Sequence, residues 1–325
     1  MVTRMGYQET VLSLANVLGF GALARRATRR QLRILCYHGV WVTPGLKFGD
    51  CTFIEPQQFE ARMARLKRSG RPVLPLAKAV ERLARDDLPD AAVVITIDDG
   101  WVSTLTHMLP VLEALDLPAT LYATSWYAQH RLPVINLAVD YLLAASGRMD
   151  LDPEEALNEI EALPVAERLA ALRAFGAGLG VGEEWYETRQ FEIMSAEELA
   201  EAGARGLDIQ LHTHRHVEIG RNVAALPQEL ADNRAFLSTV LGTEALDHFC
   251  FPSGSFHRDA LAMLMDAGIR SATLCETGLN APGSDPLALR RLLDGRNVGE
   301  AVFDGYLDGT LHLASKLRTS RAPVC

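Results

Sequence analysis

Short apolar segments alternate with helical patterns along most of the chain, and this alternation restricts the fold more than any other feature. Five segments are too short for helices and rich in β-branched or aromatic residues, as buried strands are: 32–37, 91–97, 118–123, 207–211 and 249–251. Helical spacing fills stretches between them, at 56–69, 104–115, 197–205, 227–241 and 258–267. This order predicts an α/β fold with a parallel sheet, either open or closed into a barrel.

One stretch interrupts the alternation. Residues 137–198 are rich in Ala, Leu and Glu and have helical patterns throughout, most clearly at 153–163 and 165–175. We interpret this stretch as a helical insertion over one end of the sheet, within a single domain that spans 31–325.

Composition limits the class of protein. The 325 residues are 48% apolar and 22% charged, which excludes a disordered chain, a collagen-like repeat and a coiled coil. The net charge of −9 argues against a nucleic-acid partner. Five cysteines without a CxxC pair indicate reduced thiols in a reducing compartment. Because no run of 18 apolar residues occurs, we expect no membrane-spanning helix.

The N-terminal segment, residues 1–30, has two interpretations. Val11 to Ala24 is mostly apolar and ends in small residues, as a signal peptide does. Glu9 lies at its start, however, and four arginines (25, 26, 29 and 30) follow it rather than precede it. We therefore expect an amphipathic segment that docks on the domain or on a membrane surface, in a cytoplasmic protein.

Two adjacent carboxylates follow the second predicted strand. Asp98 and Asp99 lie in the stretch Thr96-Ile97-Asp98-Asp99-Gly100. Like charges so close repel each other, and a bound cation would remove this cost. The structural alternative is that one of the two caps the next helix or forms a turn.

Three histidines follow the strand 207–211, within His212-Thr213-His214-Arg215-His216. His212 and His216, four residues apart, point the same way if a helical turn begins there, and two imidazoles then suit one metal ion. A rival ligand pair is His212 with His214 on an extended strand. The remaining alternative is an incidental surface cluster.

Two further features carry weaker signals. The strand 249–251 ends in Pro252-Ser253-Gly254, a turn that is able to aim backbone N–H groups at a ligand. Trp101 and Trp126 follow strand ends, where they either stack on a sugar ring or pack the insertion against the sheet.

In this order the motifs resemble the polysaccharide deacetylase family, also called the NodB homology or carbohydrate esterase 4-like family. Residues 96–100 resemble its Thr-Phe-Asp-Asp-Gly motif, and 212–216 resemble its His-Ser/Thr-x-x-His motif. Phe251-Pro252-Ser253-Gly254 resembles the third motif, and Tyr37-His38 is a weaker match on the first strand. The resemblance spans roughly residues 32–292.

The resemblance implies a distorted (β/α) barrel of the NodB type and one divalent metal. The implied ligands are Asp99, His212 and His216, with Asp98 as the general base. Zinc is the first choice of metal, and cobalt, nickel or iron would also fit. The implied activity removes an N-acetyl group from an amino sugar in a glycan, a lipid-linked saccharide or a glycoside. A backbone N–H near Ser253 would stabilise the oxyanion, and Trp101 and His38 are further candidates for substrate contact.

Departures from the family pattern leave two roles open. Cys250 stands where many members have the arginine of the third motif, so Arg290 or Arg291 is expected to orient Asp98. The general acid that protonates the leaving amine is His312, His38 or His257.

Two other functions stay open at this point. The same metal site would hydrolyse another C–N bond, in a formamide or a cyclic ureide. The altered third motif also fits a catalytically silent carbohydrate-binding protein with the same fold. The sequence gives no prediction of the oligomeric state.

Overall fold

Seven parallel strands close into a barrel in the computed structural model of the protein, which describes residues 20–49, 51–148 and 150–319. Their order around the barrel is β1-β4-β5-β6-β7-β8-β9, and β9 pairs with β1 to close it. The predicted α/β fold and distorted (β/α) barrel are confirmed. The strands are β1 (Arg33–Tyr37), β4 (Val93–Asp99), β5 (Thr120–Ala123), β6 (Asp208–Leu211), β7 (His248–Cys250), β8 (Ser271–Thr277) and β9 (Leu289–Leu293).

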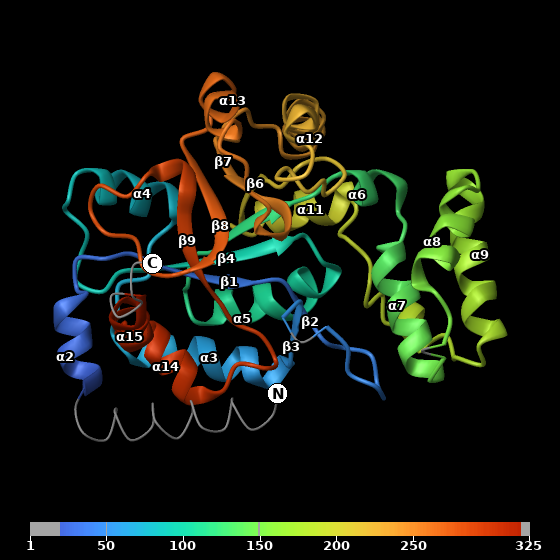
Figure 1. Cartoon of the computed structure of the whole chain (residues 1–325), viewed down its shortest axis with the longest axis horizontal. Helices are drawn as coiled ribbons and strands as arrows, with labels where there is room; N and C mark the ends of the chain where they lie inside the picture. The colour runs from blue at the N-terminus through green and yellow to red at the C-terminus, as the bar shows by residue number, and fades with distance from the viewer. Residues whose placement is uncertain (1–19, 50, 149, 320–325) are drawn as a thin grey trace, which may run out of the picture.

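Helices surround the barrel and connect successive strands, as parallel pairing requires (Figure 1). Short 3-10 turns and one π-helical turn, η1, also occur. The helices are α2 (Phe20–Ala27), α3 (Pro56–Arg68), α4 (Leu76–Ala84), α5 (Leu109–Ala114), α11 (Ala196–Ala204), α12 (Leu226–Leu241), α13 (Ala260–Asp266), α14 (Glu300–Asp308) and α15 (Thr310–Thr319); the turns are η1 (Thr104–Met108), η2 (Val223–Ala225), η3 (Pro252–Gly254) and η4 (Pro286–Ala288).

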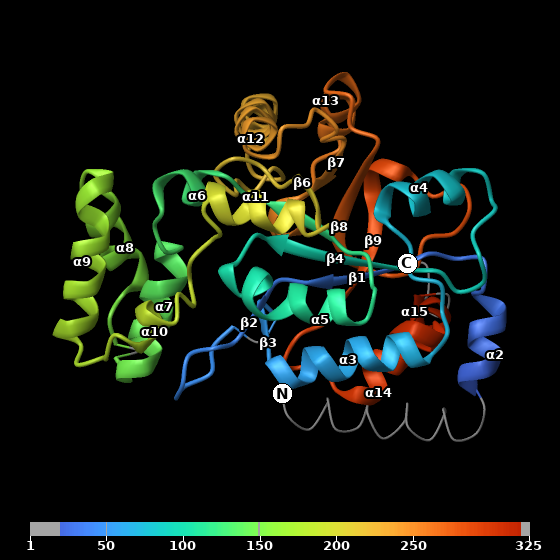
Figure 2. The same cartoon turned by 180° about the vertical axis from the view of Figure 1, so that it is seen from behind.

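The stretch between β5 and β6 contains the additional helices. They are α6 (Trp126–His130), α7 (Ile135–Ser146), α8 (Pro153–Glu161), α9 (Val165–Gly178) and α10 (Glu184–Glu187). Helices α7, α8 and α9 pack on one another at one end of the molecule, opposite α2 (Figures 1 and 2). The last helix before β6, α11, begins with a capping box between Ser195 and Glu198 and packs on α12 beside the barrel.

All seven residues of strand β4 are buried, because the strand pairs with β1 and β5 and is covered on both faces. Its register places Asp98 opposite Tyr122 and Asp99 opposite Ala123 of β5. All strand pairs of the barrel are parallel, so the residues that follow each strand gather at one end. A separate pair of short strands, β2 (Gly39–Val40) and β3 (Phe53–Ile54), lies after β1.

Three further expectations from the sequence concern the N-terminal segment, membrane-spanning helices and disulfides. Most of the predicted N-terminal segment, residues 1–19, lies outside the described residues. Within the described part, no helix is both long enough and apolar enough to span a membrane. The four cysteines there, Cys36, Cys51, Cys250 and Cys275, form no disulfide.

Candidate active site

A cleft of about 610 Å³ opens at the carboxyl ends of the strands. One side consists of residues that follow β1, β4, β6 and β7, and the other side comes from the segment between β5 and β6. The helical insertion therefore forms one wall of the cleft. The lining includes His38, Asp98, Asp99, Trp101, His212, His216 and Ser253 on the barrel side, and Tyr127, Val134, Asn136, Leu137 and Ile193 on the other.

Asp99, His212 and His216 converge at this end of the barrel. Oδ1 of Asp99 lies 3.2 Å from Nε2 of His212 and 3.4 Å from Nε2 of His216. One ligand atom from each residue lies within 4.8 Å of the other two. Asp99 and His212 are buried, and His216 is partly exposed toward the cleft. The three predicted ligands thus form one group.

The donor set fits a divalent cation. Nδ1 of His212 lies 2.9 Å from the carbonyl oxygen of Cys250, which accepts its proton and leaves a lone pair on Nε2. That lone pair faces Oδ1 of Asp99, and two acceptors at this distance repel unless a cation or proton lies between them. Two imidazole nitrogens and one carboxylate oxygen match a hydrolytic zinc site that keeps open coordination positions.

Electrostatics at the group favour a charged carboxylate. Burial alone would raise the pKa of Asp99, but its hydrogen bonds to His212 and His216 and the nearby charge of His38 hold that pKa well below its usual range. Burial alone would lower the pKa of His212, while Cys250 and the Asp99 carboxylate raise it well above the usual value. The pair therefore attracts a positive charge, either a proton or a metal ion.

Trp101 orients Asp99 from the opposite side. Its indole Nε1 donates a 2.8 Å hydrogen bond to Oδ2 of Asp99, so the other oxygen is left for the histidines. The side chain is 2% exposed and packs on Phe53, and its backbone pairs with Ile193 of the insertion. Trp101 thus packs the insertion against the barrel and supports a ligand, and it presents no open face for sugar stacking.

Four residues at or near the candidate site have left-handed backbone conformations. Asp99, Thr213, His216 and Ser253 have φ values of 73°, 62°, 57° and 55°, in the left-handed region. Such conformations cost about 1–3 kcal/mol each for residues other than glycine and are often found at functional sites.

Helix α12 holds the loop that carries the histidines. The side-chain oxygen of Asn233 accepts the backbone N–H of His212 at 3.0 Å, and its amide group donates to Ser125 Oγ at 2.8 Å. Glu229 accepts the backbone N–H of Arg215 at 2.7 Å and its guanidinium at 2.9 Å. Both α12 side chains are buried.

His214 faces away from the group. Its Nδ1 lies 2.8 Å from Oγ of Ser125, and its carbonyl oxygen accepts the hydroxyl of Thr124. The imidazoles that meet Asp99 are those of His212 and His216, which have the i, i+4 spacing. The rival pair of His212 with His214 does not form.

Asp98 is held by a buried arginine. Nη1 and Nη2 of Arg291 donate to its two oxygens at 2.7 Å each, and both side chains are nearly inaccessible. Burial alone would raise the pKa of Asp98, but the charge and hydrogen bonds of Arg291 outweigh it and lower that pKa. Arg290 instead extends outward and pairs with Glu276. The residue that orients Asp98 is therefore Arg291.

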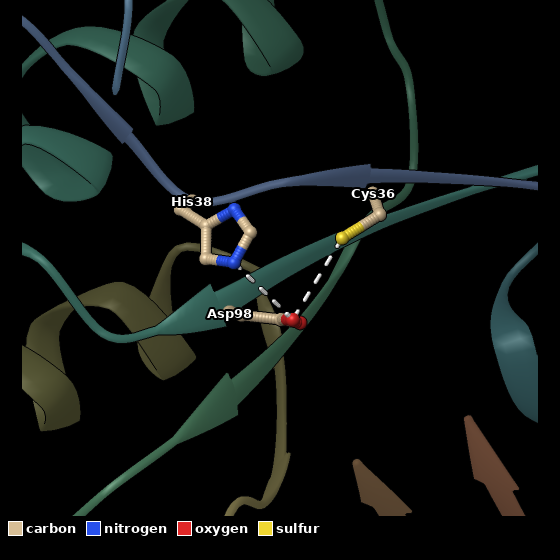
Figure 3. A group of neighbouring side chains, drawn as sticks. All are labelled: Cys36, His38 and Asp98. Carbon is tan, nitrogen blue, oxygen red and sulfur yellow. Dashed lines mark hydrogen bonds and ion pairs between the residues drawn. The ribbon is translucent and has the colours of Figure 1, made fainter. Parts of the chain in front are cut away.

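Of the three candidate acids, only His38 lines the cleft. Its Nε2 lies 3.7 Å from Oδ2 of Asp98. Figure 3 shows the imidazole directed toward this carboxylate. His312 lies on helix α15, and its Nδ1 accepts the backbone N–H of Leu279. His257 is half-exposed beside Asp259. Neither of these two histidines is part of the cleft lining.

The third motif forms a tight turn beside the cleft. Ser253 is exposed and lines the cleft, while Gly254 follows with φ +63°. A Cβ at Gly254 would lie 2.4 Å from Cβ of Cys275, so this position excludes a side chain. Trp126 is not part of the cleft lining; its ring stacks on His130 at 4.4 Å between centroids.

A model of the polysaccharide deacetylase family matches residues 85–272, more than half of the chain. The chain belongs to the polysaccharide deacetylase family. YxkH of Bacillus subtilis (strain 168), a relative named for this family, is 20% identical over 280 residues, which cover 86% of this chain and 76% of YxkH.

Solved structures of other deacetylases share the fold of this family member. PplD of Streptococcus pyogenes, in complex with acetate, superimposes with a TM-score of 0.58 at 16% identity, over 83% of this chain and 95% of PplD. IcaB of Ammonifex degensii gives a TM-score of 0.57 at 20% identity, over 86% and 97%. The de-N-acetylase of Aggregatibacter actinomycetemcomitans gives 0.58 at 15% identity, over 85% and 99%.

Proposed function

We propose that this deacetylase is a metal-dependent hydrolase that removes an N-acetyl group from an amino sugar. The observation that carries the proposal is the convergence of Asp99, His212 and His216 beside Asp98 in a single cleft. Family membership supports deacetylation of carbohydrate, and the donor set supports a divalent metal, with zinc as the first choice.

Asp98 is the proposed general base. Arg291 keeps the carboxylate of Asp98 ionised and fixes both of its oxygens. The side chain of Asp98 borders the cleft, where an attacking water would lie. When bound, the metal would polarise that water and the amide carbonyl. Asp98 accepts a proton from the water while the oxygen of the water adds to the carbonyl carbon. The C–N bond then breaks.

His38 is the proposed donor of the proton that the leaving amine needs. Its side chain is 18% exposed at the cleft and follows β1, the strand that lies between β4 of Asp98 and β9 of Arg291. The products are a free amino sugar and a carboxylate, and PplD was solved with acetate, the carboxylate that N-deacetylation releases.

The first experiment measures acetate release and metal content on the same sample. The purified protein is stripped with a chelator, assayed on oligosaccharides of N-acetylglucosamine, and assayed again after addition of zinc. We expect activity only with metal. Full activity in the stripped protein would refute metal dependence. Formylated and ureide substrates are assayed in parallel, and tight binding of the oligosaccharide without turnover would favour the silent carbohydrate-binding alternative.

The variant Asp98→Asn tests the role of the base. It should retain metal, because Asp98 is not a ligand in the proposed site, while turnover falls by about 10²–10⁴-fold. Metal content is read by elemental analysis, and acetate release by a coupled assay. Wild-type turnover in Asp98→Asn would contradict the assignment.

We further propose that helix α2 contacts a membrane surface, which would suit a lipid-linked saccharide. Phe20 and Leu23 of α2 are 53% and 65% exposed, and Arg25 and Arg26 follow them on exposed positions. Cosedimentation with anionic vesicles should fall in a Phe20→Ser/Leu23→Ser variant. Equal binding of this variant and the wild type would contradict the contact.

A further inference from the structure

A second set of metal-ligating atoms surrounds the carboxylate of Asp98. Sγ of Cys36 lies 3.7 Å from Oδ2 of Asp98, and Nε2 of His38 lies 3.7 Å from the same oxygen. The three ligand atoms all lie within 4.8 Å of one another. In Figure 3 the carboxylate of Asp98 points between the imidazole and the thiol, which come from the neighbouring strand β1 and the residue just after it.

These distances suit a small divalent ion. Zinc binds thiolate sulfur at about 2.3 Å and nitrogen or carboxylate oxygen at about 2.0–2.2 Å, so tetrahedral ligands lie roughly 3.3–3.6 Å apart. The two measured separations at Asp98 are 3.7 Å each, and only a small movement closes them around an ion. Asp98 and His38 both border the cleft, while Cys36 is buried beside them, so an ion would enter the group from the side of Asp98 and His38.

His38 presents its ligand nitrogen to this group, since Nε2 faces Oδ2 of Asp98. Among the described residues, Nδ1 of His38 is buried without a hydrogen-bond partner, so no second hydrogen bond fixes the ring. A rival group joins Asp98 to His212 and Cys250. Both nitrogens of His212 are already engaged, by Cys250 O and by Asp99, which makes His38 the better ligand.

We propose that Cys36, His38 and Asp98 form a second metal site, which binds Zn²⁺ or Co²⁺ after the first site is filled and inhibits the enzyme. On binding, the S–H bond of Cys36 breaks, a sulfur–metal bond forms and the proton goes to solvent; no atom changes oxidation state. Arg291, which contacts both oxygens of Asp98 at 2.7 Å, places a positive charge beside this site and weakens it relative to the first.

Inhibition follows from the ligands themselves and rests on the proposed function. A metal ion on Oδ2 of Asp98 and on Nε2 of His38 occupies the proposed base and the proposed proton donor together. Since general acid–base groups contribute about 10²–10⁴-fold to turnover, saturation of the second site should lower acetate release by at least about 10²-fold.

Cobalt titration of the stripped protein separates the two sites by their ligands. The first site has no sulfur, so the first equivalent of Co²⁺ should give only weak visible bands. Further Co²⁺ should add a strong near-ultraviolet band from thiolate-to-cobalt charge transfer. The Cys36→Ser variant should lose this band completely. Cys275→Ser is the matched control, because its thiol lies in the same cleft but outside the group.

Several results would overturn the proposal. The first is a charge-transfer band that survives Cys36→Ser. The second is a charge-transfer band that disappears in Cys250→Ser or Cys51→Ser instead. The third is the absence of any such band at every cobalt concentration. If Cys36→Ser does not fold, Cys36→Ala provides the comparison. X-ray absorption of the wild type with excess cobalt must also show a sulfur atom at about 2.3 Å from the metal.

The activity measurement distinguishes failure of this site from failure of the proposed function. Excess zinc should inhibit the wild type and Cys275→Ser, and Cys36→Ser should stay active at the same zinc concentration. A Cys36-dependent sulfur band in a protein without deacetylase activity would keep the site and refute the function. Metal-dependent deacetylation without a sulfur band would support the proposed function and refute the second metal site.

Discussion

Replacing Arg291 with methionine tests the buried ion pair that holds the proposed base. Both guanidinium–carboxylate distances are 2.7 Å, and the side chains of Arg291 and Asp98 are 1% and 3% exposed. Removal of one partner leaves the other as an unpaired buried charge, which costs about 3–5 kcal/mol. Arg290→Met is the matched control, because its ion pair with Glu276 is half-exposed and contributes about 0–1 kcal/mol.

The pH dependence of this loss has a definite sign. In the wild type the pKa of Asp98 is lowered, so the pair stabilises the fold above the ordinary pKa of Asp, and this contribution disappears as pH falls through the lowered value. Without Arg291, burial raises the pKa of Asp98, and protonation relieves the unpaired charge. The difference in unfolding free energy should therefore shrink as pH falls from 7 toward about 4.

Urea unfolding of wild type, Arg291→Met and Arg290→Met at several pH values measures this difference. The acid limb of the activity profile should also move to higher pH in Arg291→Met. If Arg291→Met proves too unstable, the double variant with Asp98→Asn removes both charges and should recover part of the stability. Arg291→Met within about 1 kcal/mol of Arg290→Met at pH 7, or a pH-independent gap, would refute the reasoning.

Three more predictions concern the ligand group. His216→Ala should lose the metal and His214→Ala should keep it, as measured by elemental analysis; the reverse would favour the HxH pair. Trp101→Phe removes the indole donor to the carboxylate of Asp99, a proposed metal ligand. It should weaken zinc binding by about 10–100-fold in a competitive chelator titration, and unchanged affinity would contradict this role. Asn233→Leu leaves buried partners of the histidine loop unsatisfied and should cost about 1–3 kcal/mol in urea unfolding, whereas a neutral effect would show that the loop does not need this support.

The predicted strands were recognisable as short segments dominated by apolar and β-branched residues, and β4 is the clearest of them. Strand β4 is buried along its whole length, and its sequence up to Ile97 has no competing pattern. Strands β8 and β9 of the barrel were not predicted, and in β9 Arg290 and Arg291 interrupt the apolar residues. The buried arginine is compatible with a strand only because Asp98, 193 residues earlier, neutralises it. A local pattern contains no trace of such a partner.

Some residues of the candidate site were likewise predictable from the sequence, and others were not. The four residues Asp98, Asp99, His212 and His216 were expected from their spacing and from the family motifs. Asn233 and Glu229 were not, because they look like ordinary polar residues of an amphipathic helix. Their role exists only once α12 packs against the loop after β6, where their side chains replace backbone partners that the loop lacks.

The proposed metal ligands include Asp99 and a histidine 113 positions later, and β5 lies between their two strands. An unfolded chain holds these atoms together only by chance, so a cation that needs all three ligands selects the closed barrel over every open form. Metal loading should therefore raise the melting temperature, and chelation should lower it even when no substrate is present.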